Sequence, residues 1–251
     1  MVLKTEIEWR HVEERDVSST NDYCLEKARE GAVSGLWVTA ERQTGGRGRR
    51  GRTWVSESGN LYSSLLLNNP APRENLGTLP LVAALAANFA IKKALSTSLA
   101  KIKIKWPNDV LIDGAKVCGI LLESEVISKD VISIVIGIGI NVSHHPDQAL
   151  YKTTSLNELG VKVYPPELFA HLFDEMKYVL ALWDEGRGLP AIRDLWLENA
   201  AGIDEDIKIN LPNEVLHGRF IGLSEDCNLI LRQEDGDEIK IAAGDVFLLD
   251  T

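Results

Sequence analysis

Two hydrophobic patterns occur in the larger, N-terminal part of the chain, one with the spacing of a helix and one with the spacing of a strand. After Thr20 the apolar residues recur at helical spacing; Ser19 or Thr20 can cap this helix, and Gly31 and Gly35 end it. From Lys101 to Trp106, charged and apolar residues alternate, which is the period of a strand with one wet face. This part of the chain therefore contains both helices and strands.

The other apolar segments complete a mixed or antiparallel sheet with helices, which is an α+β fold. Asp113-Gly114-Ala115 is a hairpin connection between two of the strands. The stretch from Gly45 to Arg52 holds four arginines and four glycines and is predicted to be a loop. Strands are predicted over 36–40, 60–67, 110–112, 116–122 and 131–142, and helices over 79–99, 166–182 and 189–199.

After Gly202 the pattern changes to short apolar runs separated by turn-forming residues. Short, evenly spaced strands of this kind are typical of a small β-barrel. We therefore expect two domains, a larger one over residues 1–200 and a small all-β one over residues 203–251, packed beside it. The short runs are 207–211, 215–221, 228–231, 238–241 and 246–249.

The composition limits the partners and the compartment. The chain has 27 Lys and Arg against 37 Asp and Glu, and the net charge of -10 repels nucleic acid and acidic membranes unless positive charge is locally concentrated. The three cysteines form no Cys-x-x-Cys pair, which fits a reducing cytoplasm. The stretch 79–91 is short and interrupted by Pro80 and Asn88, and the N-terminus lacks an export signal. We expect a cytoplasmic protein without nucleic-acid or membrane partners.

The loop Gly46–Arg52 is the first segment with candidate chemistry. Its glycines let backbone N–H groups approach a ligand, and its four arginines supply charge, so the loop is predicted to bind a small phosphate or carboxylate. The alternatives are a solvated basic loop and an RNA-binding tract. RNA is disfavoured because the run is single, lies between strands and belongs to an acidic chain. No Gly-Lys-Ser/Thr follows, which excludes a Walker A loop.

A second candidate segment is Lys105-Trp106-Pro107-Asn108-Asp109, where a cation, an amide and a carboxylate follow a strand. The hairpin after it returns Lys116 to the same end of the sheet. The alternative is a charged strand edge, which is our interpretation of Lys101 and Lys103. Lys116 precedes the apolar run 117–122, where a lysine can be partly buried and directed at an anion. These residues alone leave the two interpretations of Lys116 equally open.

Three weaker candidates have simpler explanations. His144-His145 with Asp147 suggests a metal site, but adjacent histidines point to opposite sides of an extended chain, so a surface loop is favoured. Cys118 has no histidine motif near it and is interpreted as an apolar strand residue rather than a nucleophile. Trp183 and Trp196 are predicted to be core aromatics. No metal site is therefore predicted.

Five short motifs follow one another between residues 19 and 142, and together they resemble the ordered motifs of biotin protein ligases, also called biotin–acetyl-CoA-carboxylase ligases. Each motif is weak alone, but five in one order are specific. Ser18 departs from the family, which usually has Asp at this position. The motifs are Ser19-Thr20-Asn21, Gln43 with the loop through Trp54, Lys105-Trp106-Pro107-Asn108-Asp109, Lys116 with Gly119-Ile120-Leu121, and Gly137-Ile138-Gly139-Ile140-Asn141.

The resemblance implies a two-step reaction that uses ATP, biotin and Mg²⁺. Biotin's carboxylate attacks the α-phosphate of ATP, giving biotinyl-5'-adenylate and pyrophosphate. A lysine of a biotin carboxyl carrier protein domain, from acetyl-CoA carboxylase or another biotin-dependent carboxylase, then takes the biotinyl group and releases AMP. The rivals are a lipoate or octanoate ligase or transferase of the same fold class, and a nucleic-acid-binding regulator that uses the arginines.

The resemblance also implies the form of the protein. The catalytic pattern begins near residue 19, so we expect a ligase without the DNA-binding domain of the repressor-ligases. The C-terminal unit would be an SH3-like β-barrel. A homodimer formed by sheet extension is expected, since the family often forms one and residues 101–105 suit an edge strand.

The resemblance assigns a role to each motif residue. Lys116 would bridge the biotin acyl oxygen and the α-phosphate, and Asp109 would assist the incoming lysine amine or a Mg²⁺ ion. Arg47, Gly48 and Arg49 would close over the carboxylate and phosphate. The implied biotin-ring contacts are Ser19, Thr20, Asn21 and Gln43; the implied ATP contacts are Arg49, Trp54, Lys105, Asn108 and Asn141; and the implied catalytic residues are Lys116, Arg47, Arg49 and Asp109.

Overall fold

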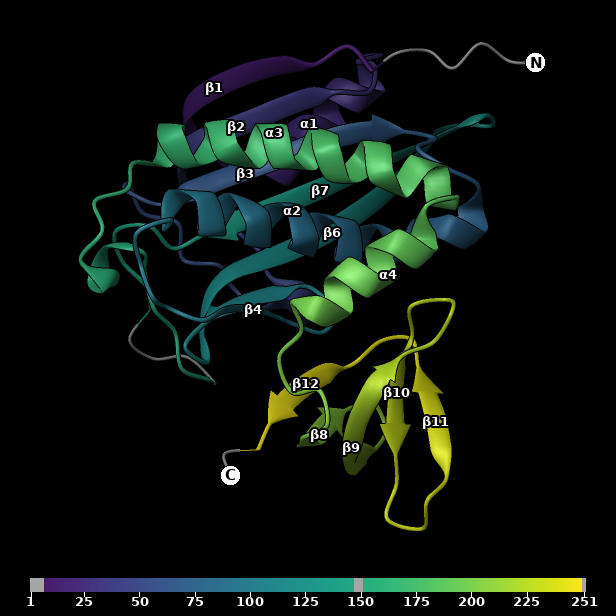
Figure 1. The fold of residues 1–251 in the computed structure, drawn as a ribbon. Coiled ribbons are helices and arrows are strands. Elements are labelled where there is room, and N and C mark those ends of the chain that lie inside the picture. The colour runs from purple at the N-terminus through teal and green to yellow at the C-terminus, as the bar shows by residue number, and fades with distance from the viewer. Residues whose placement is uncertain (1–6, 147–150, 250–251) are drawn as a thin grey trace.

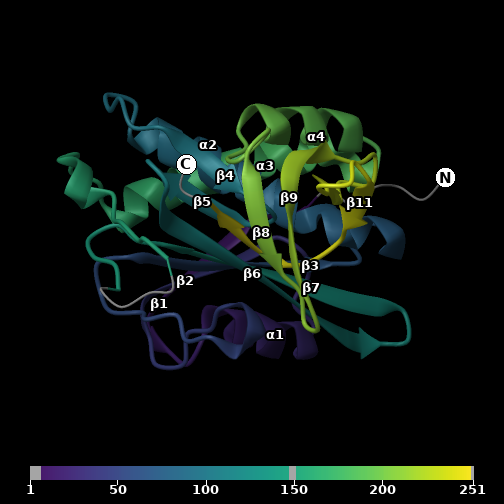
Figure 2. The ribbon, with the colours of Figure 1, turned by 90° about the horizontal axis from the view of Figure 1, so that it is seen from below.

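The computed structural model describes residues 7–146 and 151–249, and seven of its strands form one sheet (Figures 1 and 2). These strands are β1 (Arg10–Val17), β2 (Leu36–Gln43), β3 (Leu61–Asn68), β4 (Ile102–Lys105), β5 (Asp109–Ile112), β6 (Ala115–Ser128) and β7 (Val131–Ile140). They lie in the order β1-β2-β3-β7-β6-β5-β4, with β1 parallel to β2 and the other neighbours antiparallel. The predicted mixed sheet is confirmed.

Strand β1 was not predicted from the sequence. Only Val12 and Val17 of its residues are aliphatic, because an edge strand needs fewer apolar residues than a central one. Its pairing with β2 continues into the next segment, where the Thr44 and Gly45 N–H groups donate to Val17 and Ser18. β1 therefore holds the end of β2, from which the arginine-rich loop begins.

Helices cover both faces of the sheet. Helix α1 (Thr20–Arg29) lies on one face, and α2 (Leu79–Ala94), α3 (Pro165–Trp183) and α4 (Leu189–Glu198) lie on the other (Figure 2). Trp183 and Trp196 are buried, as predicted. Helix α2 ends before the predicted residue 99, because the run 96–98 of Ser, Thr and Ser favours turns over helix.

The segment Arg73–Ala94 is long and apolar enough to cross a membrane by length and composition alone. Most of it is buried inside the protein, where α2 lies on the sheet beside α3 (Figure 1). Leu85, Ala86 and Ile91 have no exposed surface. Burial in the core accounts for the apolar composition of this helix.

A second, five-stranded antiparallel sheet forms the C-terminal part and confirms the predicted all-β unit. Its order is β11-β10-β9-β8-β12, and Figure 1 shows it below α4. Trp196 of α4 packs edge-on against Phe220, with ring centroids 6.5 Å apart. The strands are β8 (Asp206–Asn210), β9 (Val215–Leu223), β10 (Leu229–Arg232), β11 (Glu238–Ile241) and β12 (Asp245–Leu248).

Strand β4 is the outermost strand of the main sheet, as expected for residues 101–105. Part of its free edge is already paired within the chain. The N–H of Ile104 donates to Asn199, and its carbonyl accepts from Ala201. These contacts join the end of α4 to the sheet and occupy backbone groups that a sheet-extending partner would need.

Candidate active site

A cavity of about 490 Å³ brings together residues from most parts of the chain. All but one of the predicted site residues line it; the exception is Asn108. Residues that the sequence analysis did not select also line it, among them Tyr151 and, from the C-terminal sheet, Asp245 and Phe247. The cavity therefore lies between the main sheet and the C-terminal unit.

Three glycines make the floor of this cavity. Gly119 of β6 pairs with Gly139 of β7, and Gly137 lies two residues before Gly139 on the same face. A Cβ atom at Gly137 would lie 2.3 Å from Oδ1 of Asn21, and one at Gly139 would lie 2.6 Å from Nε1 of Trp54. Both side chains thus lie directly on the backbone of the sheet. The alternating Gly-Ile motif follows from this, since glycines face the cavity and isoleucines the core.

The start of α1 supplies uncharged polar groups to one end of the cavity. Ser19 is the N-cap and accepts from the N–H of Asp22 at 3.4 Å, so the cap forms despite Ser18. The hydroxyl of Ser64 lies 2.7 Å from Thr20 Oγ1 and 2.6 Å from Asn21 Oδ1. All three predicted residues of this motif are buried.

Gln43, at the end of β2, joins the same network. Its Oε1 accepts from the Thr20 N–H at 2.9 Å and from the Thr20 hydroxyl at 3.1 Å, while its Nε2 donates to Ser56 Oγ at 2.9 Å. Ser56 in turn donates to the Trp54 carbonyl. The neutral groups are therefore oriented by one another, which is what a preorganised site for an uncharged polar ring requires.

The other end of the cavity is charged. Asp109 lies 2.6 Å from Lys116 Nζ and 3.2 Å from Lys105 Nζ, and all three side chains are largely buried. Tyr151 covers both lysines, with its ring centroid 4.8 Å from Lys105 Nζ and 5.3 Å from Lys116 Nζ. Of the two interpretations of Lys116, the structure favours a buried lysine directed into the cavity.

The charges at this end stabilise each other. Burial alone would raise the pKa of Asp109, but the ammonium groups of Lys116 and Lys105 outweigh it and hold the pKa below its usual value. Burial would likewise lower the pKa of Lys116, but Asp109 and Tyr151 outweigh it and raise the pKa. Lys116 is therefore a cation and Asp109 an anion at neutral pH.

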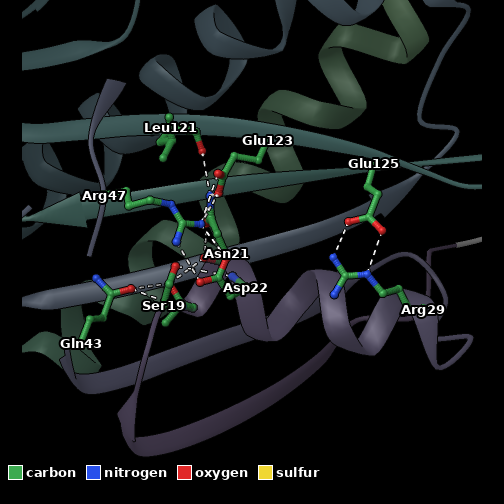
Figure 3. Close-up of polar contacts among 11 residues, drawn as sticks. Ser19, Asn21, Asp22, Arg29, Gln43, Arg47, Leu121, Glu123 and Glu125 are labelled. Carbon is green, nitrogen blue, oxygen red and sulfur yellow. Dashed lines mark hydrogen bonds and ion pairs between the residues drawn. The ribbon is translucent and has the colours of Figure 1, made fainter. Parts of the chain in front are cut away.

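Arg47 is bound by two carboxylates at the α1 end of the cavity (Figure 3). Asp22 accepts from its Nη1 and Nη2 at 2.8 and 2.6 Å, and Glu123 of β6 accepts from Nη2 at 3.1 and 3.2 Å. Hydrogen bonding to Arg47, partly opposed by burial, lowers the pKa of Asp22. Neither carboxylate was selected from the sequence.

The other three arginines of the loop contact the C-terminal unit. Arg50 and Arg52 lie 3.0 and 2.5 Å from the Asp245 carboxylate, and Arg49 lies 3.8 Å from it. Arg49 also donates to the Gly244 carbonyl at 2.9 Å. Asp245 is 193 residues from Arg52 in sequence. The sequence around the arginine-rich loop therefore gives no sign that Asp245 balances its positive charge.

Three of the predicted ATP contacts differ in their relation to the cavity: Trp54, Asn108 and Asn141. The Trp54 indole lies on Gly139 with its ring centroid 5.6 Å from Lys116 Nζ. Asn141 lines the cavity and donates to the Thr154 carbonyl at 3.1 Å. Asn108 does not line it, because its amide donates to the Ile120 carbonyl while its oxygen accepts from Arg49. The implied ATP contact of Asn108 therefore stays a prediction, and in the structure its oxygen is bound by Arg49.

Of the weaker candidates, His145 is hydrogen-bonded within the chain and Cys118 is buried. His145 binds Glu158 at 2.8 Å and Thr153 at 2.9 Å, and the described ranges 7–146 and 151–249 contain no group of three potential metal ligands. Asp147 lies outside those ranges. Cys118 is completely buried, and burial raises the pKa of its thiol, so it is not a nucleophile.

Comparisons with known proteins agree with this arrangement. Residues 13–141 match the model of the Biotin/lipoate A/B protein ligase family, and residues 202–249 match the Biotin protein ligase C terminal domain. The chain is 36% identical over 238 residues to the biotin–acetyl-CoA-carboxylase ligase of Paracoccus denitrificans, covering 91% of this chain and 96% of that protein.

Two further similarities extend over nearly the whole chain. It is 34% identical to the bifunctional ligase/repressor BirA of Bacillus subtilis, covering 98% of this chain and 76% of that protein. Its structure resembles that of the biotin protein ligase from Aquifex aeolicus in complex with biotin and ATP, with a TM-score of 0.80 and 31% identity. That similarity covers 96% of this chain and 99% of the other.

Proposed function

The chain belongs to the biotin/lipoate A/B protein ligase family, and from this premise we propose how its cavity activates and transfers biotin. The protein is a biotin protein ligase: it forms biotinyl-5'-AMP from biotin and ATP and transfers the biotinyl group to a carrier protein. The observation that carries the proposal is that one cavity joins the neutral network of Thr20 and Gln43 to the charged group of Lys116, Asp109 and Lys105.

In the first step, biotin lies with its ring at the neutral end and its carboxylate toward Lys116. Thr20 and Gln43 match the donors and acceptors of the ureido ring. A carboxylate oxygen forms a bond to the α-phosphorus of ATP while the bond to pyrophosphate breaks. Both reactants are anions, and Lys116 offsets the negative charge that accumulates as they meet. Arg47 binds the biotin carboxylate equally before and during this step, and Arg49 supplies a further donor from the loop.

In the second step, the amine of the carrier lysine attacks the acyl carbon of biotinyl-AMP. A C–N bond forms, the mixed anhydride C–O bond breaks, AMP leaves, and the proton of the amine passes to water. Asp109 is ionised and faces the cavity, so it is placed to accept a hydrogen bond from the incoming amine. Its low pKa makes it an orienting acceptor rather than a store for the proton.

Magnesium fits this site only as a partner of the nucleotide. Both oxygens of Asp109 are engaged by lysine ammonium groups, so this carboxylate is not free to bind a metal directly. Mg²⁺ commonly binds substrate phosphates with few protein ligands and would enter here with ATP. We assign it no separate step.

The wider proposal concerns the parts of the chain and their partners. Residues 1–200 form the catalytic unit and residues 203–251 the unit that holds the arginine loop through Asp245. The acceptor is a lysine of a biotin carboxyl carrier domain, and the compartment is the cytoplasm. A homodimer formed by extending the sheet at β4 would have to displace Asn199 and Ala201 from Ile104, so the proposed enzyme acts without it.

The experiment that tests this function is ATP–pyrophosphate exchange with biotin, lipoate or octanoate as the acid. Biotin alone should support fast exchange, because the uncharged hydrogen-bonding groups around Thr20 and Gln43 match a ureido ring and not a dithiolane or an alkyl chain. Exchange that is faster with lipoate or octanoate would reject biotin as the substrate. The absence of exchange with all three acids would reject adenylation itself.

A further inference from the structure

Glu123 and Glu125 lie two residues apart on β6, and each binds an arginine (Figure 3). Glu125 binds Arg29 at the protein surface, with contacts of 2.8 and 2.5 Å. Glu123 binds Arg47 and also Asn21, both of which line the cavity. The two glutamates thus lie on the same strand and each binds its own arginine, but only Glu123 contacts residues of the cavity.

The carboxylate of Glu123 sets the orientation of the Asn21 amide. Nδ2 of Asn21 donates to Glu123 Oε2 at 2.7 Å and to the Leu121 carbonyl at 3.4 Å, so its oxygen is left to face the Ser64 hydroxyl. Asn21 is 4% exposed and lies on Gly137, so it has no room to move away from these partners. Of the hydrogen bonds of the Asn21 amide, the one to the Glu123 carboxylate is the strongest, because its acceptor is ionised.

The same carboxylate holds the arginine loop. Arg47 comes from the loop after β2, Asp22 from α1 and Glu123 from β6, and the three side chains meet at one guanidinium. Glu123 is therefore the point at which the sheet contacts both the neutral network and the loop. Without it, Arg47 would be held by α1 alone.

We propose that Glu123 is a positioning residue for biotin, which holds the Asn21 amide and the Arg47 guanidinium so that the ring-binding and carboxylate-binding parts of the site keep one relative position. This inference rests on the proposed function and adds a residue outside the five sequence motifs. Glu123 does not take part in bond formation. Loss of Glu123 weakens biotin binding and leaves the reacting groups at Lys116 in place.

Glu123→Gln separates the charge from the shape of this side chain. Its amide oxygen can still accept from Asn21, but its amide nitrogen then faces Arg47, which is also a donor. Losing a charge-assisted contact typically weakens binding by about 10- to 100-fold. Because Arg47 and Glu123 are partly exposed, we expect about tenfold.

The test measures adenylate formation in the full chain for the wild type, Glu123→Gln and Glu125→Gln. Glu123→Gln should raise KM for biotin about tenfold with kcat within about twofold of wild type, and Glu125→Gln should match wild type in both. Glu123→Asp, which keeps the charge at a shorter reach, should give an intermediate KM. An unchanged KM in Glu123→Gln, or a kcat loss as large as the change in KM, overturns the inference.

A second measurement separates positioning from general destabilisation. Biotin dissociation constants are measured for Asn21→Ala, Glu123→Gln and the double variant. If Glu123 acts through Asn21, its substitution has a smaller effect once Asn21 is absent; fully additive effects overturn the inference. A wild type that forms no adenylate would reject the proposed function, whereas an active wild type with a silent Glu123→Gln rejects only this inference.

Discussion

Lys116→Ala removes the cation that the mechanism places between biotin's carboxylate and the α-phosphate. The ammonium lies 2.6 Å from Asp109 and the Lys116 side chain is 10% exposed, so water does little to screen the charge. Removing one such electrostatic donor commonly costs about 10² to 10³ in rate, or about 3 to 4 kcal/mol. Asp109 keeps Lys105 at 3.2 Å, so the remaining carboxylate is still paired and the fold should survive.

The assay is single-turnover formation of biotinyl-AMP, with biotin affinity measured separately by calorimetry. Adenylate formation by Lys116→Ala should fall by about that factor of 10² to 10³. Biotin affinity should change far less, because the Thr20 and Gln43 contacts do not involve Lys116. Lys101→Ala is the matched control, since Lys101 is exposed and outside the cavity. Adenylate formation at the wild-type rate, or an equal loss of biotin affinity, would refute the assignment.

Three other changes test separate parts of the site. Asp245→Asn removes the counter-charge of Arg50 and Arg52 and should make bound adenylate escape about five- to tenfold faster, which is measured as biotinylation of bystander lysines. Asp206→Asn, which breaks a surface ion pair, should not have this effect, and equal escape from both variants would contradict the role of Asp245 in holding the loop. Gly137→Ala places a methyl group against Asn21 and should weaken biotin binding about tenfold or more, whereas Gly77→Ala, whose methyl group contacts no other atom, should not. Similar biotin affinities of the two variants would be inconsistent with the close contact between Gly137 and Asn21. Burial opposes the charge of Lys116 but Asp109 outweighs it and raises the lysine pKa above its ordinary value of 10.5, so Lys116 stays charged and adenylate formation should show no loss from about pH 7 to 10. A fall centred near pH 8 to 9 would mean that Lys116 loses its proton there.

Local patterns predicted most of the fold because each element carries its own signal. The alternation around Ile102 and Ile104 and the apolar run of α2 indicate their secondary structure without reference to the rest of the chain. Strand β1 has no such signal, since its pairing with β2 stabilises it and its own side chains bury little surface. The end of α2 was misplaced because serine and threonine bonding to the backbone ended it early.

The residues of the site were likewise predicted in part. The ordered motifs identified the residues that line the cavity, but the contacts that orient them come from residues far away in sequence. Asp245 is 193 residues from Arg52, and Glu123 is 76 residues from Arg47. An isolated aspartate or glutamate has the same appearance in the sequence whether it faces solvent or an arginine of the site. Only the fold shows which acidic residues are used.

The central claim is that this cavity joins a biotin carboxylate oxygen to the α-phosphorus of ATP before the carrier lysine displaces AMP. Biotin labelled with oxygen-18 in its carboxylate tests this directly when the enzyme acts on biotin, ATP and the carrier domain. The AMP released should carry one labelled oxygen and pyrophosphate none. Biotinylated carrier formed together with unlabelled AMP, or label found in pyrophosphate, would contradict it.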